Sequence, residues 1–151
     1  MSPSASETVH ASAVLVGERA VLIRGPAGAG KSRLAWALCE AGRTGSLPYA
    51  RLVADDRVRI FVAGERLLAA APDTIRGLIE MRGLGVRRLE HEPLALVSLV
   101  VDLDAKDAAR LPEPRSGETE ILGIRLARLT VAPGEEAFPL VMARFSSAAV
   151  A

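Results

Sequence analysis

The sequence contains little cysteine, little lysine and no long apolar run. Its one cysteine, Cys39, excludes a disulfide bond within the chain and is expected to be a small buried apolar side chain. No apolar stretch approaches the ~18 residues that a membrane-spanning helix requires, and residues 1–8 lack the basic and apolar regions of a signal peptide. The net charge of +1 gives no global attraction to nucleic acid or to a membrane surface. We therefore expect a cytoplasmic protein with neither kind of partner.

The residues that are abundant favour one folded domain. Half of the 151 residues are apolar, which excludes a chain that is disordered throughout, and this length is sufficient for one hydrophobic core. Small polar residues at the start predict a loose tail over residues 1–8. We expect the domain to cover residues 9–145 and a frayed tail to cover residues 146–151.

The most informative motif is Gly25-Pro26-Ala27-Gly28-Ala29-Gly30-Lys31-Ser32, which fits the Walker A or P-loop pattern G-x-x-x-x-G-K-S. A loop that wraps a triphosphate must turn its backbone N–H groups inward, and glycine permits this because it has no Cβ atom and tolerates positive φ. Lys31 can reach the β- and γ-phosphates, and the Ser32 hydroxyl can bind Mg²⁺. Only Lys31 and Lys106 among the 19 basic residues are lysine, so a lysine in this loop is informative. The motif predicts binding of a nucleoside triphosphate.

The segments on either side of the motif support this interpretation. Residues 19–24 are mostly apolar and predict a strand, and downstream apolar residues recur at helical spacing up to a stop at Gly42. The loop would therefore lie between a strand and a helix, with bound phosphate at the positive end of the helix dipole.

A second motif, which is acidic, follows the P-loop by about twenty residues. Residues 50–54 predict a short strand that ends in Asp55-Asp56, where α/β sheets bind their ligands. One carboxylate can hold Mg²⁺ and the other can accept a proton from an attacking hydroxyl. The alternative is a turn between strands that contains two aspartates, and the P-loop favours the catalytic interpretation.

The rest of the chain predicts mainly strands, in the order of an α/β fold. A hairpin over residues 57–71 departs from a simple doubly wound sheet, and residues 104–117 predict a mobile loop over a site. We further expect strands at residues 9–16, 95–103 and 121–131, a short helix that begins at residues 72–74, and a C-terminal helix at residues 137–145.

Four further residues have two interpretations each. His10 is either a surface histidine or part of a site. Glu80 and Arg82, embedded among apolar residues, either bind Mg²⁺ and phosphate or form a structural ion pair. Arg110 either reaches the transferred phosphate or is a solvated loop side chain.

Taken in order, these motifs resemble the catalytic domain of the HPr kinase/phosphorylase family. The order is a histidine in a Val-His-x stretch, the P-loop, Leu-Val-Ala-Asp-Asp-Arg-Val at residues 52–58, and Glu-x-Arg-Gly-Leu-Gly-Val at residues 80–86. The last signature is far more specific than the P-loop, and the resemblance covers about residues 9–145. It implies an α/β P-loop kinase domain with a mixed β-sheet and flanking helices, similar to phosphoenolpyruvate carboxykinase. It also implies a short form without the separate N-terminal domain of longer members.

The resemblance implies roles for individual residues. Residues 25–32 would bind ATP together with Mg²⁺, and Asp55 would accept the proton of a serine hydroxyl of HPr. The implied catalytic residues are Asp55, His10, Lys31 and Arg110, and the implied metal ligands are Ser32, Glu80 and Asp56.

The resemblance also implies a partner and an assembly. HPr, or an HPr-like phosphocarrier of the phosphotransferase system, would be the acceptor, inorganic phosphate would drive the reverse reaction, and the chain would form a homo-oligomer, a hexamer in this family. Residues 132–136 are acidic here, whereas the family has basic residues in a loop tied to dephosphorylation. We therefore expect kinase activity more firmly than phosphorylase activity. A small-molecule kinase and a non-catalytic ATP sensor remain alternatives, and the signature at residues 80–85 favours the protein kinase over both.

Overall fold

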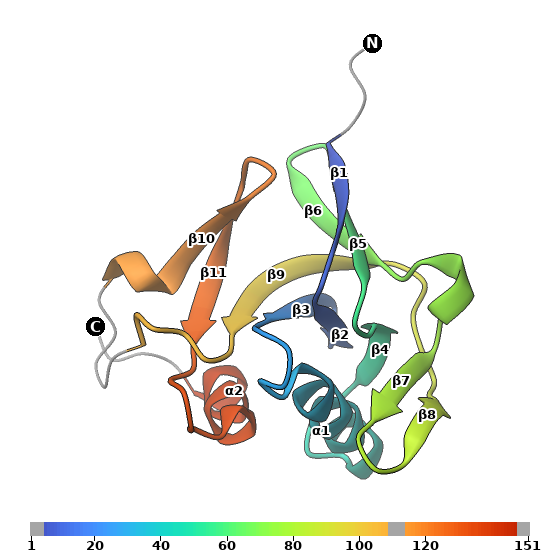
Figure 1. The fold of residues 1–151 in the computed structure, drawn as a ribbon. Coiled ribbons are helices and arrows are strands. Elements are labelled where there is room, and N and C mark those ends of the chain that lie inside the picture. Colours follow the sequence, from blue (N-terminus) through green and yellow to red (C-terminus); the bar gives the residue numbers. More distant parts are fainter. Residues whose placement is uncertain (1–4, 109–113, 148–151) are drawn as a thin grey trace.

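The computed structural model describes residues 5–108 and 114–147, which form one curled sheet, a separate small hairpin and two helices (Figure 1). The strands are β1 (Ser6–Val9), β2 (Ser12–Val16), β3 (Arg19–Arg24), β4 (Ala50–Ala54), β5 (Val58–Ala63), β6 (Arg66–Ala70), β7 (Leu78–Met81), β8 (Gly85–Arg88), β9 (Ala95–Asp102), β10 (Glu118–Ile121) and β11 (Ile124–Thr130). The helices are α1 (Lys31–Thr44) and α2 (Ala137–Ser146), with short 3₁₀ helices η1 (Asp73–Ile75) and η2 (Pro114–Gly117).

The central strand of the large sheet is β9. Nine strands form this sheet, in the order β1-β5-β6-β9-β3-β2-β4, with β11 also paired to β9 and β10 paired to β11. Strands β3 and β11 are parallel to β9, whereas β6 is antiparallel to it, so the sheet is mixed. The parallel strands β3, β9 and β11 place their carboxyl ends at one edge, which is where ligands bind in α/β sheets.

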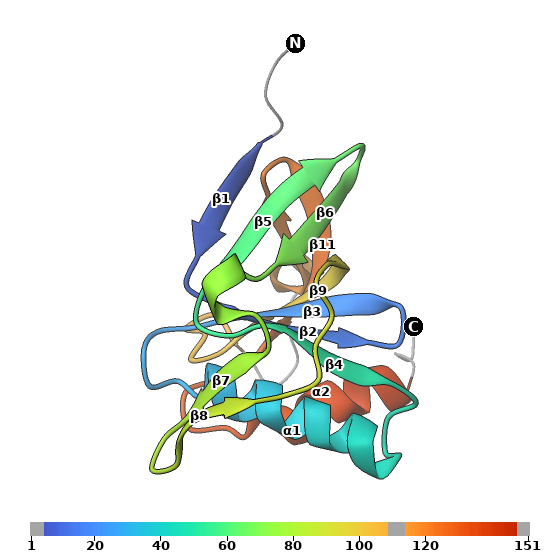
Figure 2. The ribbon, with the colours of Figure 1, turned by 90° about the vertical axis from the view of Figure 1, so that its right-hand side faces the viewer.

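The two faces of the sheet are buried in different ways. Side chains alternate along β3, so that Val21 and Ile23 pack towards the helices while Ala20 and Leu22 pack towards the other layer. Both helices cover the same face, and the hairpins β5–β6 and β10–β11 curl over the opposite one (Figure 2). None of the helices that the structure describes is long and apolar enough to cross a membrane.

Most predicted strands are confirmed, but several predicted boundaries are wrong. The expected strand over residues 9–16 is two strands, and the first begins at Ser6, inside the stretch that was expected to be a loose tail. The reason is tertiary, because Val9 pairs with Val58 of β5 while Ser12 pairs with Ile23 of β3. The chain therefore passes from one part of the sheet to another at His10.

The helix after the P-loop does not end at Gly42. It continues to Thr44 and is capped by Gly45, which has the positive φ of 90° that is common at helix C-termini. Gly42 instead permits a close approach, because a Cβ atom there would lie 2.7 Å from the Cβ atom of Ala50. Its role is to let α1 pack against the start of β4.

Two segments form hairpins that the sequence did not specify. Residues 121–131, expected as one strand, turn at Leu122 and Gly123, both with positive φ, so that β10 and β11 pair. The predicted short helix is η1, one 3₁₀ turn, and the signature segment after it forms the hairpin of β7 and β8.

Candidate active site

The P-loop connects β3 to α1, as its pattern predicts. Gly28 and Gly30 have φ of 84° and 102°, a region that side-chain-bearing residues rarely adopt, and an added Cβ atom at either would meet nothing within 4 Å. The loop therefore has an open face beside the N-terminus of α1, where the helix dipole and unpaired N–H groups favour an anion. Gly25 is packed differently, since a Cβ atom there would lie 3.0 Å from the Cβ atom of Leu103.

The Lys31 side chain folds back over the loop. Its Nζ donates hydrogen bonds to the carbonyl oxygens of Gly25, at 2.7 Å, and Pro26, at 3.1 Å. Both acceptors are neutral. An anionic phosphate oxygen is a stronger acceptor for an ammonium group, so a bound phosphate can take these hydrogen bonds over.

Asp55, which directly follows β4, is a buried carboxylate with only 4 % of its surface exposed. Its Oδ1 accepts hydrogen bonds from the hydroxyls of Ser12 and Ser32, each at 2.7 Å. Its Oδ2 accepts a hydrogen bond from the backbone N–H of Glu80 at 3.2 Å. These bonds compensate for the burial of the charge and connect three elements, β2, α1 and β7, to one carboxylate.

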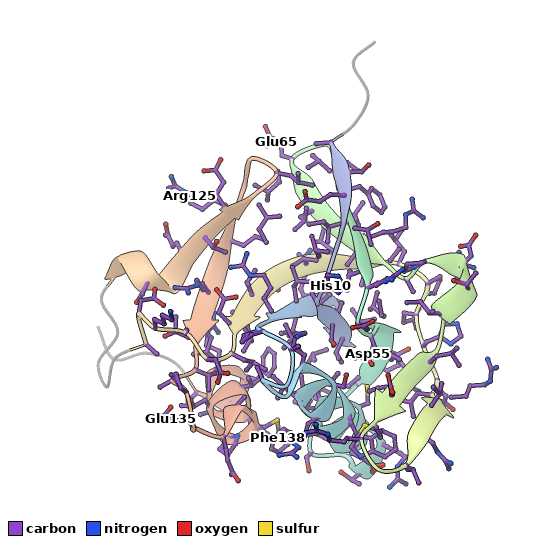
Figure 3. The ribbon with its side chains drawn as sticks, in the orientation of Figure 1. His10, Asp55, Glu65, Arg125, Glu135 and Phe138 are labelled. Atoms are coloured by element: carbon purple, nitrogen blue, oxygen red, sulfur yellow. The ribbon has the colours of Figure 1, made fainter. Side chains whose placement is uncertain are left out.

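The remaining predicted residues lie at different distances from this centre. His10 lies two residues before Ser12, at the end of β2 nearest to Asp55, but its side chain is exposed and makes no contact that joins it to Asp55 (Figure 3). Asp56 is exposed and has a positive φ of 69°. Arg110 lies outside the described residues.

The Glu80 and Arg82 side chains do not form the ion pair that was one of their interpretations. Both side chains are exposed, and among the described residues there is no ion pair between Glu80 and Arg82. Glu80 contributes its main-chain N–H to Asp55 instead.

Within residues 5–108 and 114–147, no three acidic, histidine or cysteine side chains come together as a group that could hold a metal. Ser32 contacts Asp55 rather than Asp56.

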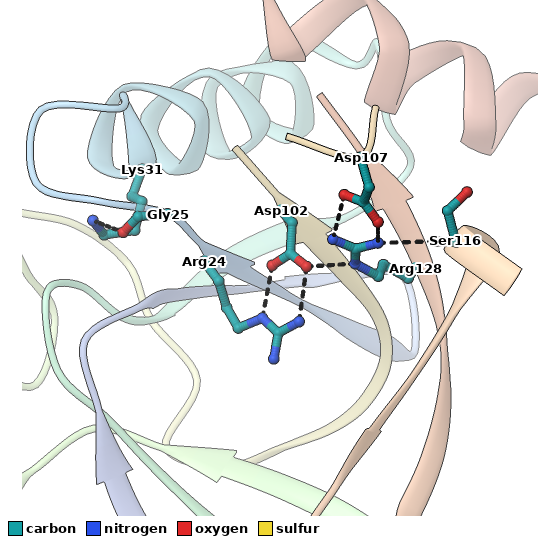
Figure 4. Close-up of polar contacts among 7 residues, drawn as sticks. All are labelled: Arg24, Gly25, Lys31, Asp102, Asp107, Ser116 and Arg128. Atoms are coloured by element: carbon teal, nitrogen blue, oxygen red, sulfur yellow. Dashed lines mark hydrogen bonds and ion pairs between the residues drawn. The ribbon is translucent and has the colours of Figure 1, made fainter. Parts of the chain in front are cut away.

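A network of arginine and aspartate residues supports the other side of the P-loop (Figure 4). Asp102, at the end of β9, accepts two hydrogen bonds from Arg24, at 2.7 and 2.8 Å, and one from Arg128 Nε at 2.5 Å. Arg128 also donates to Asp107 at 2.6 Å and to the Ser116 carbonyl at 3.2 Å. Since Arg24 is the residue before the P-loop, the network fixes the start of that loop to β9, β11, Asp107 and Ser116.

The network changes the acidity of its members. Burial would raise the pKa of Asp102, but the hydrogen bonds from Arg24 and Arg128 outweigh it and hold the pKa below its usual value. The hydrogen bond from Arg128 likewise lowers the pKa of Asp107, and these partners raise the pKa of Arg128. Asp102, Asp107 and Arg128 therefore remain charged near neutral pH.

This arrangement predicts an acid-sensitive contribution to stability. A carboxyl with a lowered pKa in the folded state stabilises the protein above its unfolded pKa of about 3.9, and this contribution is lost as the pH falls through the folded value. Asp102→Asn should therefore lower the free energy of unfolding by about 2 kcal/mol at pH 7, and the difference from wild type should shrink towards pH 3. Urea unfolding at both pH values measures it.

The matched control for this experiment is Asp104→Asn. Asp104 is exposed, two residues further on, and has no ion pair within the described part of the chain. This variant should unfold like wild type at both pH values. An Asp102→Asn deficit that is as large at pH 3 as at pH 7 would contradict the assignment.

Sequence reasoning missed four residues that the structure places around the P-loop, namely Ser12, Arg24, Asp102 and Arg128. Ser12 is completely buried, and a hydroxyl inside the apolar run of residues 11–16 is a signal, because such a group requires a partner. Arg24 ends one predicted apolar strand and Asp102 lies one residue before the end of another, which places both at the carboxyl edge of the sheet once those strands are known to be parallel.

The fold and this site define a class of protein. A strand, a glycine-rich loop with GKS, a helix and a carboxylate bound to the loop serine make this a P-loop domain of the α/β class. The family model described as HPr Serine kinase C-terminal domain matches residues 2–143, and the chain therefore belongs to that family. The family resemblance and the mixed-sheet fold expected from the sequence are confirmed.

Individual relatives agree with the family. The HPr kinase/phosphorylase of Geobacillus thermodenitrificans is 37 % identical over an alignment of 134 residues, and the match covers 82 % of this chain and 41 % of that protein. The HPr kinase/phosphorylase of Neisseria meningitidis serogroup C is 33 % identical over an alignment of 112 residues, and the match covers 69 % of this chain and 33 % of that protein. This chain thus spans less than half of the length of these curated relatives.

A solved structure shows the same fold. The Hpr(Ser) kinase/phosphatase from Coxiella burnetii superposes with a TM-score of 0.72, with 90 % of this chain and 86 % of that chain covered. The sequences are 24 % identical over this match.

Proposed function

We propose that this domain transfers the γ-phosphate of ATP to a serine hydroxyl of HPr or an HPr-like phosphocarrier of the phosphotransferase system. The observation that supports this most is the hydrogen bond from Ser32 of the P-loop to the buried Asp55 carboxylate. It joins the phosphate-binding loop to a group that can accept a proton. The named activity of the relatives above supports the same acceptor.

The chain's own groups supply most of the chemistry in this proposal. The open face of the P-loop receives the phosphates with its backbone N–H groups, and Lys31 exchanges its two carbonyl acceptors for phosphate oxygens. Asp55 accepts the proton of the attacking serine hydroxyl. The hydrogen bonds from Ser12 and the Glu80 N–H hold this carboxylate in one orientation, so little reorganisation is needed during transfer.

The oxygen donors around the P-loop fit Mg²⁺, which prefers hydroxyl, carboxylate and phosphate oxygens. Ser32 contacts Asp55. Asp56 and Glu80, the other two acidic residues of the family motifs, have exposed side chains. We propose Ser32, Asp56 and Glu80 as the residues that hold the ion. When bound, Mg²⁺ neutralises developing charge on the transferred phosphoryl group.

Further assignments belong to the same proposal. His10, at the edge of the sheet nearest to Asp55, and Arg110 act on the transferring phosphate. The single domain, expected over residues 9–145, extends from β1 at Ser6 to the end of α2 at Ser146. It assembles as a homo-oligomer in the cytoplasm, a hexamer as the family resemblance implies. Phosphorolysis of phosphoserine by inorganic phosphate is the weaker activity, because the turn that follows β11 contains Glu135 and Glu136 where basic residues would attract phosphate.

The test is label transfer from radioactive ATP and Mg²⁺ to purified HPr by the purified chain. We expect radioactive label on HPr, and we expect none when either the purified chain or Mg²⁺ is left out. A pool of small metabolites incubated without HPr is the matched control and should remain unlabelled.

The alternatives make different predictions in the same experiment. A small-molecule kinase would label the metabolite pool and ignore HPr. A non-catalytic ATP sensor would bind ATP and label neither. Either result would overturn the proposal, and labelled HPr would support it.

A further inference from the structure

A pocket of about 450 Å³ lies between the C-terminal half of α1 and the segment that follows β8. Its lining includes Trp36, Cys39, Arg43, Arg51, Arg88 and Leu89, together with Glu40 and Glu90. None of them belongs to the P-loop, and Cys39 lies roughly 12 Å along α1 from Lys31 at 1.5 Å per residue. The pocket is therefore a separate feature from the candidate active site.

The floor of the pocket is apolar and neutral. Trp36, Cys39 and Leu89 are half-buried and pack against the core cluster beneath the helices. Burial raises the pKa of the Cys39 thiol to about 12, so it remains a neutral S–H group at physiological pH. An aromatic ring and an aliphatic side chain on such a floor favour a flat apolar body.

The rim of the pocket carries three arginines and two glutamates, which gives it a net charge of +1. Arg43 pairs with Glu40 at 2.7 Å, and Arg51 pairs with Glu90 at 3.0 Å. Arg88 also lines the pocket, is exposed, and has no ion pair within the described residues. Its guanidinium group is therefore available to a ligand, while the two glutamates oppose a ligand of high negative charge.

We propose that this pocket binds a small organic anion, with a single acidic group on Arg88 and a flat apolar body against Trp36 and Leu89. The volume lies within the range of about 300–1,000 Å³ that is usual for small-molecule sites. The proposal does not depend on the kinase function, because its test requires neither ATP nor HPr.

Trp36 provides the measurement, because it is the one tryptophan of the chain. Anilinonaphthalene sulfonate has an aromatic body and one negative charge, and it accepts energy from tryptophan fluorescence. We expect saturable quenching of Trp36 with energy transfer to the probe. Naphthalene sulfonate should displace the probe, whereas inorganic phosphate, with charge and no apolar body, should not.

Variants connect the signal to the pocket. Arg88→Ala should weaken probe binding by about tenfold, the loss of one charge-assisted hydrogen bond, and Arg88→Glu should abolish it. Arg87→Ala is the matched control, since Arg87 is exposed on the same strand but points to its other face and does not line the pocket. Lys31→Met should leave probe binding unchanged, which separates this pocket from the P-loop.

Several results would overturn the proposal. Binding that is unchanged in Arg88→Glu, or equally weakened in Arg87→Ala, would exclude Arg88 as the anion partner. Displacement by inorganic phosphate, or loss of binding in Lys31→Met, would place the probe in the P-loop. Equal melting temperatures of all variants verify that unfolding does not cause the signal.

Discussion

Asp55→Asn is expected to reduce phosphate transfer to HPr by about a thousandfold, within the range that general-base groups contribute. Asparagine has the same shape as aspartate, and the Ser12 and Ser32 hydroxyls can rotate to bond its amide, so the fold should be retained. An amide cannot accept the proton of the attacking serine. The rate of label transfer at saturating ATP measures the effect.

The control for this variant is Glu65→Gln. Glu65 is an exposed acidic residue at the turn between β5 and β6, well separated from Asp55 in Figure 3. Its substitution should leave the rate unchanged. A folded Asp55→Asn protein that transfers phosphate at the wild-type rate would remove Asp55 from the chemistry and favour a role as a structural anchor of the P-loop.

Lys31→Met is expected to weaken ATP binding by about a hundredfold and to abolish measurable transfer. Charge-assisted hydrogen bonds from an ammonium group to phosphate contribute about 1.5–3 kcal/mol, and the carbonyl partners of Lys31 show that its side chain lies over the loop. Methionine retains the length of the side chain and removes the charge. Titration with a fluorescent ATP analogue measures the affinity separately from catalysis.

Lys106→Met is the matched control because Lys106 is the other lysine of the chain and is exposed. It should bind ATP as wild type does. Equal losses in the two variants would indicate a general effect of positive charge, whereas unchanged affinity in Lys31→Met would show that the P-loop lysine does not contact phosphate.

The parts of the fold that local patterns determine were predictable from the sequence. The strand at residues 19–24, the glycine-rich loop and the strand that precedes Asp55 each have their signal within a few neighbouring residues. Hydrophobic alternation also predicted the hairpin of β5 and β6. The polar contacts of the site were not predictable in this way, because Ser12 and Asp55 are 43 residues apart and Arg24 and Asp102 are 78 apart.

Errors arose where a tertiary contact overrode a local signal. Glycine is common where helices end, and Gly42 was therefore predicted as the end of the helix. It lies inside α1 instead, because its missing Cβ atom lets the helix approach Ala50. The residues on both sides of His10 are typical of a strand, but the chain pairs with β5 before His10 and with β3 after it. Neither contact has a signature in the neighbouring residues.

The most direct test of the central claim is to identify the amino acid that receives the phosphate. HPr should be incubated with ATP, Mg²⁺ and either the wild-type chain or Asp55→Asn, then treated with acid, digested and examined by mass spectrometry. The account predicts one acid-stable phosphoserine in the wild-type reaction and none in the Asp55→Asn reaction. Phosphate on another residue type, or the same phosphoserine formed by both proteins, would contradict transfer to serine with Asp55 as the proton acceptor.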